Sequence, residues 1–296
     1  MIFHFIHNHL DEHTVVKMCE VLKVSPSGYY KWRSKLNATP NERAAEKKEV
    51  EQKISKSFHE SFGTYGSPRI HDDLVEWGYT LSLKTVARYM KELGLRATPT
   101  QKYLTTTDSN HSYTIYPNLV NRQFEVSLPD QIWVADITYI WTDEGWLYLA
   151  SIMDLFSRKI IAWDVADHLR KELPLGVLKR ALETRNPSEN LIHHSDRGSQ
   201  YCSNDYTDLL KEHEVQISMS RKGDPYDNAC IESFHATIKK ELVYRNRFTT
   251  RTEAQKAVSS YIDTFYNARR KHSTLGYFSP NKFERNYRLF SMEKIS

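Results

Sequence analysis

Apolar residues recur at helical spacing in the first third of the chain, and strand-like apolar runs begin near residue 126. Residues 13–33 and 68–95 each predict two short helices around a turn, and residues 41–60 predict a charged, solvated helix. The paired helices are typical of helix-turn-helix units, although many small helical hairpins share this pattern. Residues 97–123 show no clear period, which indicates a linker that crosses DNA or a partner subunit.

The second helix of residues 68–95 has recognisable ends, with Ser82 as a candidate N-cap and Gly94 as a candidate C-terminal stop. Lys84 and Arg88 are predicted to point outward, as a DNA-recognition helix requires. An exposed basic face with no role in DNA binding would have the same pattern. The side chains expected to face the core are Leu83, Val86, Tyr89, Met90 and Leu93.

The second half of the chain alternates between strands and helices. The segments IWVADITYIW, WLYLASIMDLF and KIIAWDVAD are separated by turn residues at 143–145 and 157–158, which predicts three hairpin-linked strands. A helix in KELPLGVLKRALETR, a short strand in LIHHSD and a helix in SNDYTDLLKEHEV follow. This order predicts an α/β layer with a mixed sheet.

Three acidic residues stand out against this pattern. Asp136 interrupts an apolar strand, Asp196 follows the short strand, and Glu232 opens a helix four residues after Asn228, a good N-cap. Carboxylates gathered on a core repel one another and are costly to desolvate, so a divalent cation is the usual remedy. Mg²⁺ prefers oxygen ligands, and two such ions can clamp both oxygens of a phosphodiester displacement. An Asp capped by backbone N–H groups is the structural alternative for Asp136, and we expect Asp154 to be such a structural acid.

Residues near these acids are candidates for DNA contact. Lys239 lies two helical turns after Glu232, and Arg221 and Lys222 lie in a polar loop that precedes the helix. His193 and His194 are candidates for supporting a carboxylate or touching phosphate. A histidine pair can also bind metal, but hard Mg²⁺ disfavours imidazole.

Charge is distributed unevenly around a net value of +4. Residues 99–234 hold 13 Lys or Arg and 20 Asp or Glu, whereas residues 235–296 hold 13 and 5. An acidic middle suits a metal site, and a basic tail with interleaved Tyr and Phe suits nucleic acid. The tail contributes three further predicted DNA contacts, Arg269, Arg270 and Lys271.

Cysteine usage and hydropathy limit the class of protein. The chain has three cysteines, far apart and without a CxxC pair, which indicates a reducing cytoplasm and argues against a disulfide framework and a structural zinc site. No apolar run approaches the length of a membrane helix, so no membrane partner is expected.

The motifs HHSDRGSQY, DNACIESF, ADITYI and YNARRKHSTLGYFSP resemble the DDE transposases of insertion-sequence family three, of the orfB type. The segments VLKVSPSGYYKWR and YGSPRI fit the same family. This resemblance implies an RNase H-like integrase core with a mixed five-stranded sheet, with Asp136 on the first strand, Asp196 after the fourth and Glu232 on a later helix.

We therefore expect five segments along the chain. These are a helix-turn-helix-like segment at 1–38, a helical DNA-binding domain at 39–98, a linker at 99–125, the catalytic core at 126–245 and a basic helical region at 246–296.

The resemblance also implies an activity. Asp136, Asp196 and Glu232 are implied as catalytic residues and as ligands of two Mg²⁺ ions, for which Mn²⁺ substitutes. The implied reaction is DNA strand cleavage followed by strand transfer by a 3′-hydroxyl, in copy-out, paste-in movement. The implied partners are double-stranded DNA (terminal inverted repeats and target), further copies of the chain in a homo-oligomer, and an upstream-frame product or frameshift fusion. The implied location is the bacterial cytoplasm, at the nucleoid. A nuclease that cuts without joining, and a DNA-binding regulator with an inert core, are the alternatives.

Overall fold

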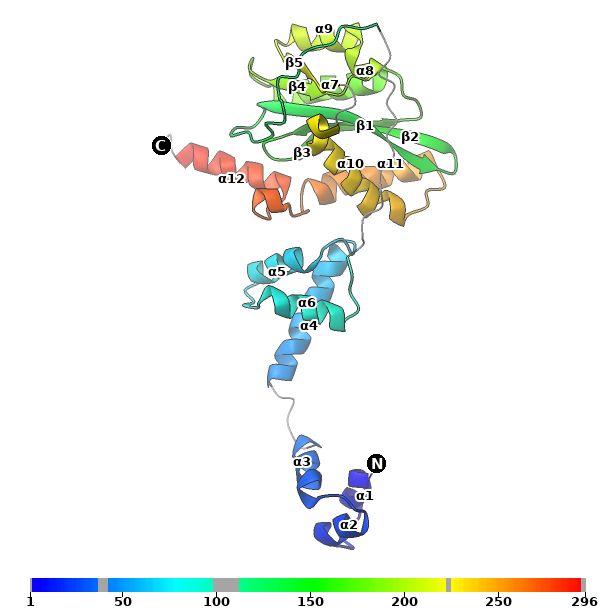
Figure 1. Ribbon diagram of the computed structural model, residues 1–296, viewed down its shortest axis with the longest axis vertical. Helices are drawn as coiled ribbons and strands as arrows, with labels where there is room; N and C mark the ends of the chain where they lie inside the picture. The colour runs from blue at the N-terminus through cyan, green and yellow to red at the C-terminus, as the bar shows by residue number, and fades with distance from the viewer. Residues whose placement is uncertain (1, 37–41, 98–111, 222–224, 294–296) are drawn as a thin grey trace. The chain divides into compact units, whose positions relative to one another are not determined.

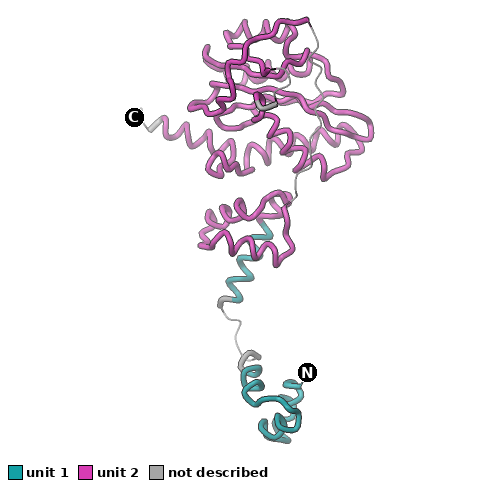
Figure 2. Tube along the Cα trace, viewed as in Figure 1, with its two compact units in different colours: residues 1–56 teal, residues 57–296 magenta. Residues whose placement is uncertain are grey.

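The computed structural model describes residues 2–36, 42–97, 112–221 and 225–293. The chain divides into two compact units, Met1–Lys56 and Ser57–Ser296 (Figure 2). The five predicted segments are finer than this division, and their boundaries stay predictions.

The first unit contains three short helices, α1 (Ile2–Asn8), α2 (Val15–Val21) and α3 (Pro26–Leu36), and the first part of α4 (Glu42–Glu60). The two helices predicted within residues 13–33 and the charged helix at 41–60 are therefore confirmed. The small core of α1–α3 is built on the buried side chains Ile6, Met18, Cys19 and Tyr29.

The second unit begins with the helix pair α5 (Ser67–Glu76) and α6 (Leu83–Glu92). The predicted ends of α6 are confirmed, because Ser82 Oγ accepts a hydrogen bond from the Thr85 N–H at 3.2 Å and Gly94 has a φ of +69°.

The predicted buried face of α6 is too wide. Val86 and Met90 are buried, but Leu83 and Leu93 are 46% and 36% exposed. Leu83 is the first residue of the helix and Leu93 is its C-cap, so both lie at the ends of the helix, where less of the neighbouring structure covers them.

The following strands form one mixed five-stranded sheet in the order β3-β2-β1-β4-β5, as the sequence predicts. The strands β1, β2 and β3 pair antiparallel, whereas β4 pairs parallel with β1 and β5 pairs parallel with β4. Their bounds are β1 Ile132–Thr142, β2 Gly145–Asp154, β3 Lys159–Ala166, β4 Ile192–Ser195 and β5 Gln216–Met219.

Helices cover both faces of the sheet (Figure 1). One face packs on α7 (Glu172–Arg185), α8 (Ser199–Cys202) and α9 (Asn204–Glu212), with Trp133 and Leu178 fully buried between the layers. The other face carries α10 (Ala229–Glu241) and α11 (Arg251–Ser259). A π-helical turn continues α11, and α12 (Pro280–Glu293) follows. None of the helices in the described ranges has the length and apolar character that a membrane crossing needs.

A buried arginine ties three parts of this architecture together. Arg185, the last residue of α7, donates to Asp130 at 2.8 Å, to Asp154 at the end of β2 at 3.2 Å and to Glu284 of α12 at 3.0 Å. The Arg185 side chain is only 7% exposed, and that of Asp154 is fully buried. The structural role predicted for Asp154 is therefore confirmed.

Arg185→Gln is expected to lower the free energy of unfolding by about 3 kcal/mol, because breaking a buried ion pair leaves its partner carboxylates uncompensated. Urea unfolding followed by circular dichroism measures this loss. The matched control is Arg180→Gln on the same helix, where Arg180 pairs with Asp164 at 2.9 Å but is 54% exposed. Exposed pairs contribute about 1 kcal/mol or less, so equal losses in the two variants would contradict the assignment.

Candidate active site

The pairing of β1 with β4 brings Asp136 and Asp196 to one edge of the sheet. The parallel ladder ends at the pair Ala135↔Ser195, and the two acids are the next residues on their chains. Neighbouring strands lie about 4.8 Å apart, so the backbones of both acids are close although 59 residues separate them in sequence. Both side chains are partly exposed at this edge, where a substrate can reach them.

The third acid reaches the same edge on a helix. Glu232 lies in the first turn of α10, as predicted. Asn228 occupies the N-cap position, but its side chain does not cap the helix; Nδ2 instead donates to the carbonyl oxygen of Ala135 at 3.3 Å. Asn228 therefore fastens the start of α10 to β1, one residue before Asp136.

Electrostatics show that the three acids form one cluster. Burial, and then the negative charges of Asp136 and Asp196, raise the pKa of Glu232 to about 7. Over the described residues, however, no three His, Cys, Asp or Glu side chains are arranged so that they could hold a metal ion. The fold gathers the acids without arranging their oxygens as a finished set of ligands.

Asp136 is oriented by a hydrogen-bonded chain across the sheet. His235 Nδ1 lies 3.2 Å from Asp136 Oδ2, and His235 Nε2 lies 2.9 Å from Ser151 Oγ. With the proton on Nδ1, the imidazole donates to Asp136 and accepts from the serine hydroxyl. Sequence analysis missed Ser151; its signal is a lone small polar residue in the apolar strand that pairs with β1, directly opposite Asp136.

Asp196 is held by the turn that follows it. The Gly198 N–H donates to Asp196 Oδ1 at 2.9 Å. A Cβ atom at residue 198 would lie 3.0 Å from the same oxygen, so a side chain there would push against the carboxylate. Glycine at this position therefore lets the backbone approach the carboxylate without displacing it.

His193 and His194 do not reach the surface, and their predicted contact with DNA is corrected to a structural role. Both are buried in β4, His193 beside Tyr206 Oη at 3.0 Å and His194 beside Ser218 Oγ at 2.8 Å. Burial lowers the pKa of His193 to about 3 and that of His194 to about 4. The physical reason is that β4 is a central strand, so side chains on both of its faces are covered.

Two basic residues of the tail are also internal. Arg270 is buried and bonds Glu241 with two nitrogens, at 2.9 and 2.7 Å. Lys271 is buried against acids of α5, with Asp73 at 2.8 Å. Their predicted DNA contacts are corrected, because each charge is already neutralised inside the protein. Arg269 is exposed, and its contact with DNA stays a prediction.

The other candidate cations lie in different places. Lys84 and Arg88 are exposed on α6. Arg221 is half exposed and bonds Asp227 through both its backbone N–H and its Nε at 2.9 Å. Lys222 lies outside the described residues. Lys239 points from α10 towards β1, with Nζ 4.2 Å from the centre of the Tyr139 ring. Contact of these five side chains with DNA stays a prediction.

Comparison with known families matches two parts of the chain. Integrase core domain models match residues 127–225 and 213–280, and an HTH-like domain model matches residues 45–103. The RNase H-like integrase core and the helical unit before it agree with the fold that the sequence predicts.

Relatives of known name cover nearly the whole chain. The chain is 42% identical over 270 residues to the insertion element IS600 uncharacterized 31 kDa protein of Shigella sonnei, covering 91% of this chain and 98% of that protein. It is 39% identical over 280 residues to transposase InsF for insertion sequence IS3A of Escherichia coli (strain K12), covering 95% and 97%. Among solved structures, the magnesium complex of the HTLV-2 integrase catalytic core (trimeric form) aligns with 54% of this chain and 99% of its own, at 13% identity and a TM-score of 0.41.

The neutral, buried state of His193 predicts a loss of stability in acid. Between about pH 6.5, the pKa of an unperturbed histidine, and the folded value of about 3, the unfolded chain binds a proton that the folded chain does not. Stability therefore falls as the pH is lowered below about 6.5. His193→Gln removes this titration. The decrease in the free energy of unfolding between about pH 6.5 and about pH 4.5 is therefore expected to be smaller by roughly 2 kcal/mol in this variant.

Urea unfolding at a series of pH values measures this effect. His213→Gln is the control, because His213 is exposed on the surface after α9. An unchanged pH profile in His193→Gln would show that the imidazole is accessible to protons in the folded protein.

Proposed function

The chain belongs to the family of integrase-core transposases of insertion sequence IS3, and from this premise we propose that it cuts DNA strands at the ends of a mobile element and joins the freed 3′-hydroxyl to a second phosphodiester. One observation carries the proposal: the fold brings Asp136, Asp196 and Glu232 together at one partly exposed edge of the sheet. We propose that water hydrolyses the first phosphodiester and that the freed 3′-hydroxyl then attacks the second one directly, displacing its 3′-oxygen as a new hydroxyl end. No covalent bond between protein and DNA forms.

The chemistry of the residues present fits Mg²⁺, although their oxygens are not arranged as a finished set of ligands. The donor set is three carboxylates, which are the hard oxygen ligands that Mg²⁺ prefers. The raised pKa of Glu232 supports the fit, because a cation among these acids would relieve the repulsion that raises it. Asp136, Asp196 and Glu232 would hold the metal, and two ions with Mn²⁺ as a substitute are part of the proposal. Bound Mg²⁺ would supply charge neutralisation and Lewis-acid activation at the phosphodiester.

The protein side chains have separate tasks in this reaction. His235 holds Asp136 in one orientation through its hydrogen bonds to Asp136 and Ser151. The Gly198 N–H fixes the carboxylate of Asp196. Glu232 lies in the first turn of a helix whose start is fastened to β1, so it approaches the other two acids from across the edge of the sheet. We propose that Lys239, further along the same helix, contacts the DNA backbone.

The proposed partners follow from the chemistry and the matched domains. The substrate is double-stranded DNA, both the terminal inverted repeats of the element and its target. Exposed Lys84 and Arg88 on α6, inside the region that matches the HTH-like model, are the proposed contacts outside the core. We also propose that the chain forms a homo-oligomer, that it acts with an upstream-frame product or as a frameshift fusion, and that it works in the cytoplasm at the nucleoid. The proposed segments of the chain are 1–38, 39–98, 99–125, 126–245 and 246–296.

Asp136→Asn, Asp196→Asn and Glu232→Gln are each expected to reduce strand cleavage and joining by more than roughly 10³-fold, because each removes a negative ligand from a group that acts as a unit. Affinity for DNA should be nearly unchanged, since phosphate contacts come from other side chains. The measurement uses a labelled duplex with the terminal inverted repeat that flanks the gene, with Mg²⁺ present, and gel analysis of the products.

Asp164→Asn is the matched control, because Asp164 is an acid of the same sheet that pairs with Arg180 away from the cluster. Full cleavage by any one of the three variants would refute the role of that residue. A duplex with a pre-formed 3′-hydroxyl end separates the alternatives: a transposase joins it to a second DNA, a nuclease does not, and an inert regulator does neither.

A further inference from the structure

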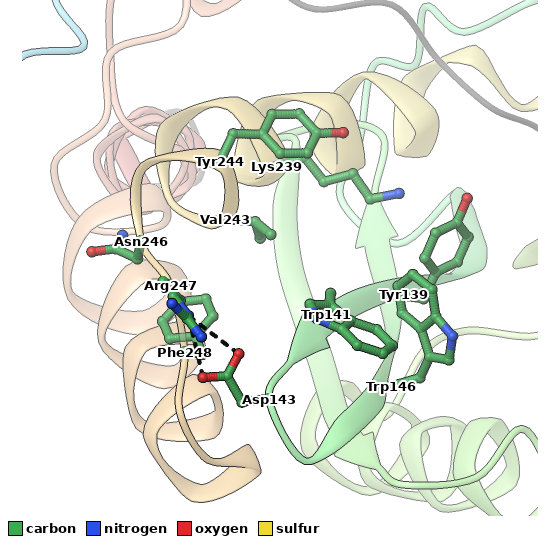
Figure 3. Close-up of a pocket in the computed structure, with 10 residues that line it drawn as sticks. All are labelled: Tyr139, Trp141, Asp143, Trp146, Lys239, Val243, Tyr244, Asn246, Arg247 and Phe248. Carbon is green, nitrogen blue, oxygen red and sulfur yellow. Dashed lines mark hydrogen bonds and ion pairs between the residues drawn. The ribbon is translucent and has the colours of Figure 1, made fainter.

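An aromatic pocket lies beside the acidic cluster, and of its lining only Lys239 has a role in the reaction proposed above. Its cavity of about 370 Å³ is formed by the end of the β1–β2 hairpin, by α10 and by residues 243–248 (Figure 3). Tyr139 and Trp141 come from β1, and Trp146 stands opposite Trp141 across the hairpin. We call the cavity lined by these three rings, Lys239, Tyr244 and Arg247 the aromatic pocket.

Three aromatic side chains of the aromatic pocket are strongly exposed. Trp146 meets Trp141 and Tyr139 edge to face, with ring centres 4.8 and 5.1 Å apart. Trp141 is 56% exposed, Trp146 44% and Tyr244 58%, so large aromatic surfaces face solvent. A solvent-exposed aromatic group of this size on a folded domain indicates a binding site.

Cations border these rings. Lys239 Nζ lies 4.2 Å from the centre of the Tyr139 ring, and Arg247, whose side chain is 85% exposed, pairs with Asp143 at 3.2 Å. Figure 3 shows the Lys239 ammonium above the Tyr139 ring on one side of the cavity and the Arg247–Asp143 pair on the other. Aromatic faces for stacking with a basic rim are the combination by which proteins bind unpaired bases of nucleic acid.

The spacing to the acidic cluster fits a DNA strand. Lys239 lies seven residues after Glu232 on α10, which is roughly 10 Å along the helix axis. Tyr139 lies three residues after Asp136 on β1, which is also roughly 10 Å. Successive nucleotides of one strand are about 3.4 Å apart along a duplex axis and farther apart where a base is unstacked, so the aromatic pocket lies within a few nucleotides of a phosphodiester held at the acids.

We propose that the aromatic pocket receives one unstacked base of the DNA substrate, within a few nucleotides of the cleavage site. Stacking on one of the two nearly perpendicular tryptophans, with the other ring against the edge of the base, holds the base, while Lys239 and Arg247 attract the adjoining phosphates. The inference rests on the proposed function, because it takes the acidic cluster as the position of the scissile phosphate. Extruding a base costs duplex stacking and pairing, and stacking on protein rings offsets that cost.

The test combines protein variants with abasic DNA. Duplexes with the terminal inverted repeat that flanks the gene carry a single abasic site at each of about the first six nucleotides beside the cleavage site. Trp141→Ala and Trp146→Ala are expected to weaken equilibrium binding of intact DNA by roughly 10-fold. At one abasic position within this range, wild-type protein should lose similar affinity, and the tryptophan variants should lose little more. Trp141→Phe and Trp146→Phe, which keep a ring, should restore most of the binding.

Phe290→Ala is the control, because Phe290 is an exposed aromatic residue on α12. It should leave the abasic profile unchanged. Losses of affinity that add at every abasic position would overturn the proposal. Tryptophan variants that change the sedimentation of the free protein but not its abasic profile would also overturn it. That result would assign the aromatic pocket to contact between copies of the chain.

Binding is the readout, so the two proposals fail separately. If the losses of affinity from the tryptophan variants and from one abasic position are not additive, but no strand is cleaved, the proposed chemistry is refuted and the pocket is supported. Cleavage without any coupled position would refute the pocket alone, and no binding of the duplex at all would refute both.

Discussion

The parallel pairing of β1 with β4 is the constraint on which the site depends. It brings Ala135 and Ser195 to the same rung of the sheet, and the chains continue from there as Asp136 and Asp196. The antiparallel pairing of β1 with β2 adds Ser151 opposite Asp136, and Asn228 fastens α10 to the same stretch of β1. Three segments that are distant in sequence therefore meet at one point, because backbone ladders and one side-chain amide fix their register.

Neutralisation of charge separates the acids of the fold from the acids of the site. Three hydrogen bonds from Arg221 hold the pKa of Asp227 well below its usual range. Glu241 is likewise bonded by Arg270 inside the protein, and its pKa is lowered. Glu232 departs in the opposite direction, because burial and two neighbouring acids oppose its ionisation. Burial and Asp130 also raise the pKa of the structural Asp154, to about 7, but Arg185 bonds that carboxylate. At Glu232 the charged neighbours that shift the pKa are both acids, so negative charge accumulates at this edge of β1.

The sequence was sufficient for the elements that depend on local pattern. The alternation in residues 132–166 predicted the three hairpin-linked strands, and the cap at Ser82 predicted the start of α6. The grouping of Asp136, Asp196 and Glu232 came from motifs that resemble a family, since no local rule says which acids will meet.

The errors concern partners that are distant in sequence. Lys271 bonds acids about two hundred positions earlier in the chain; Asp72, for example, precedes it by 199 positions. Arg270 bonds Glu241. A run of basic residues in the sequence does not reveal which of its side chains are buried and paired with acids inside the protein. His193 and His194 were misplaced for a related reason: the central position of β4 depends on the order of all five strands.

The internal position of Lys271 bears on how the protein can be divided. Arg245 also donates to the carbonyl oxygen of Gly63, at 3.2 Å, so the helical segment near residues 57–76 is bonded to the C-terminal part of the same compact unit. A truncated protein that starts at the edge of the integrase core match, at residue 127, would lack the acids that compensate the Lys271 ammonium. Buried charge and its counter-ions therefore extend this compact unit well upstream of the integrase core match, towards residue 57.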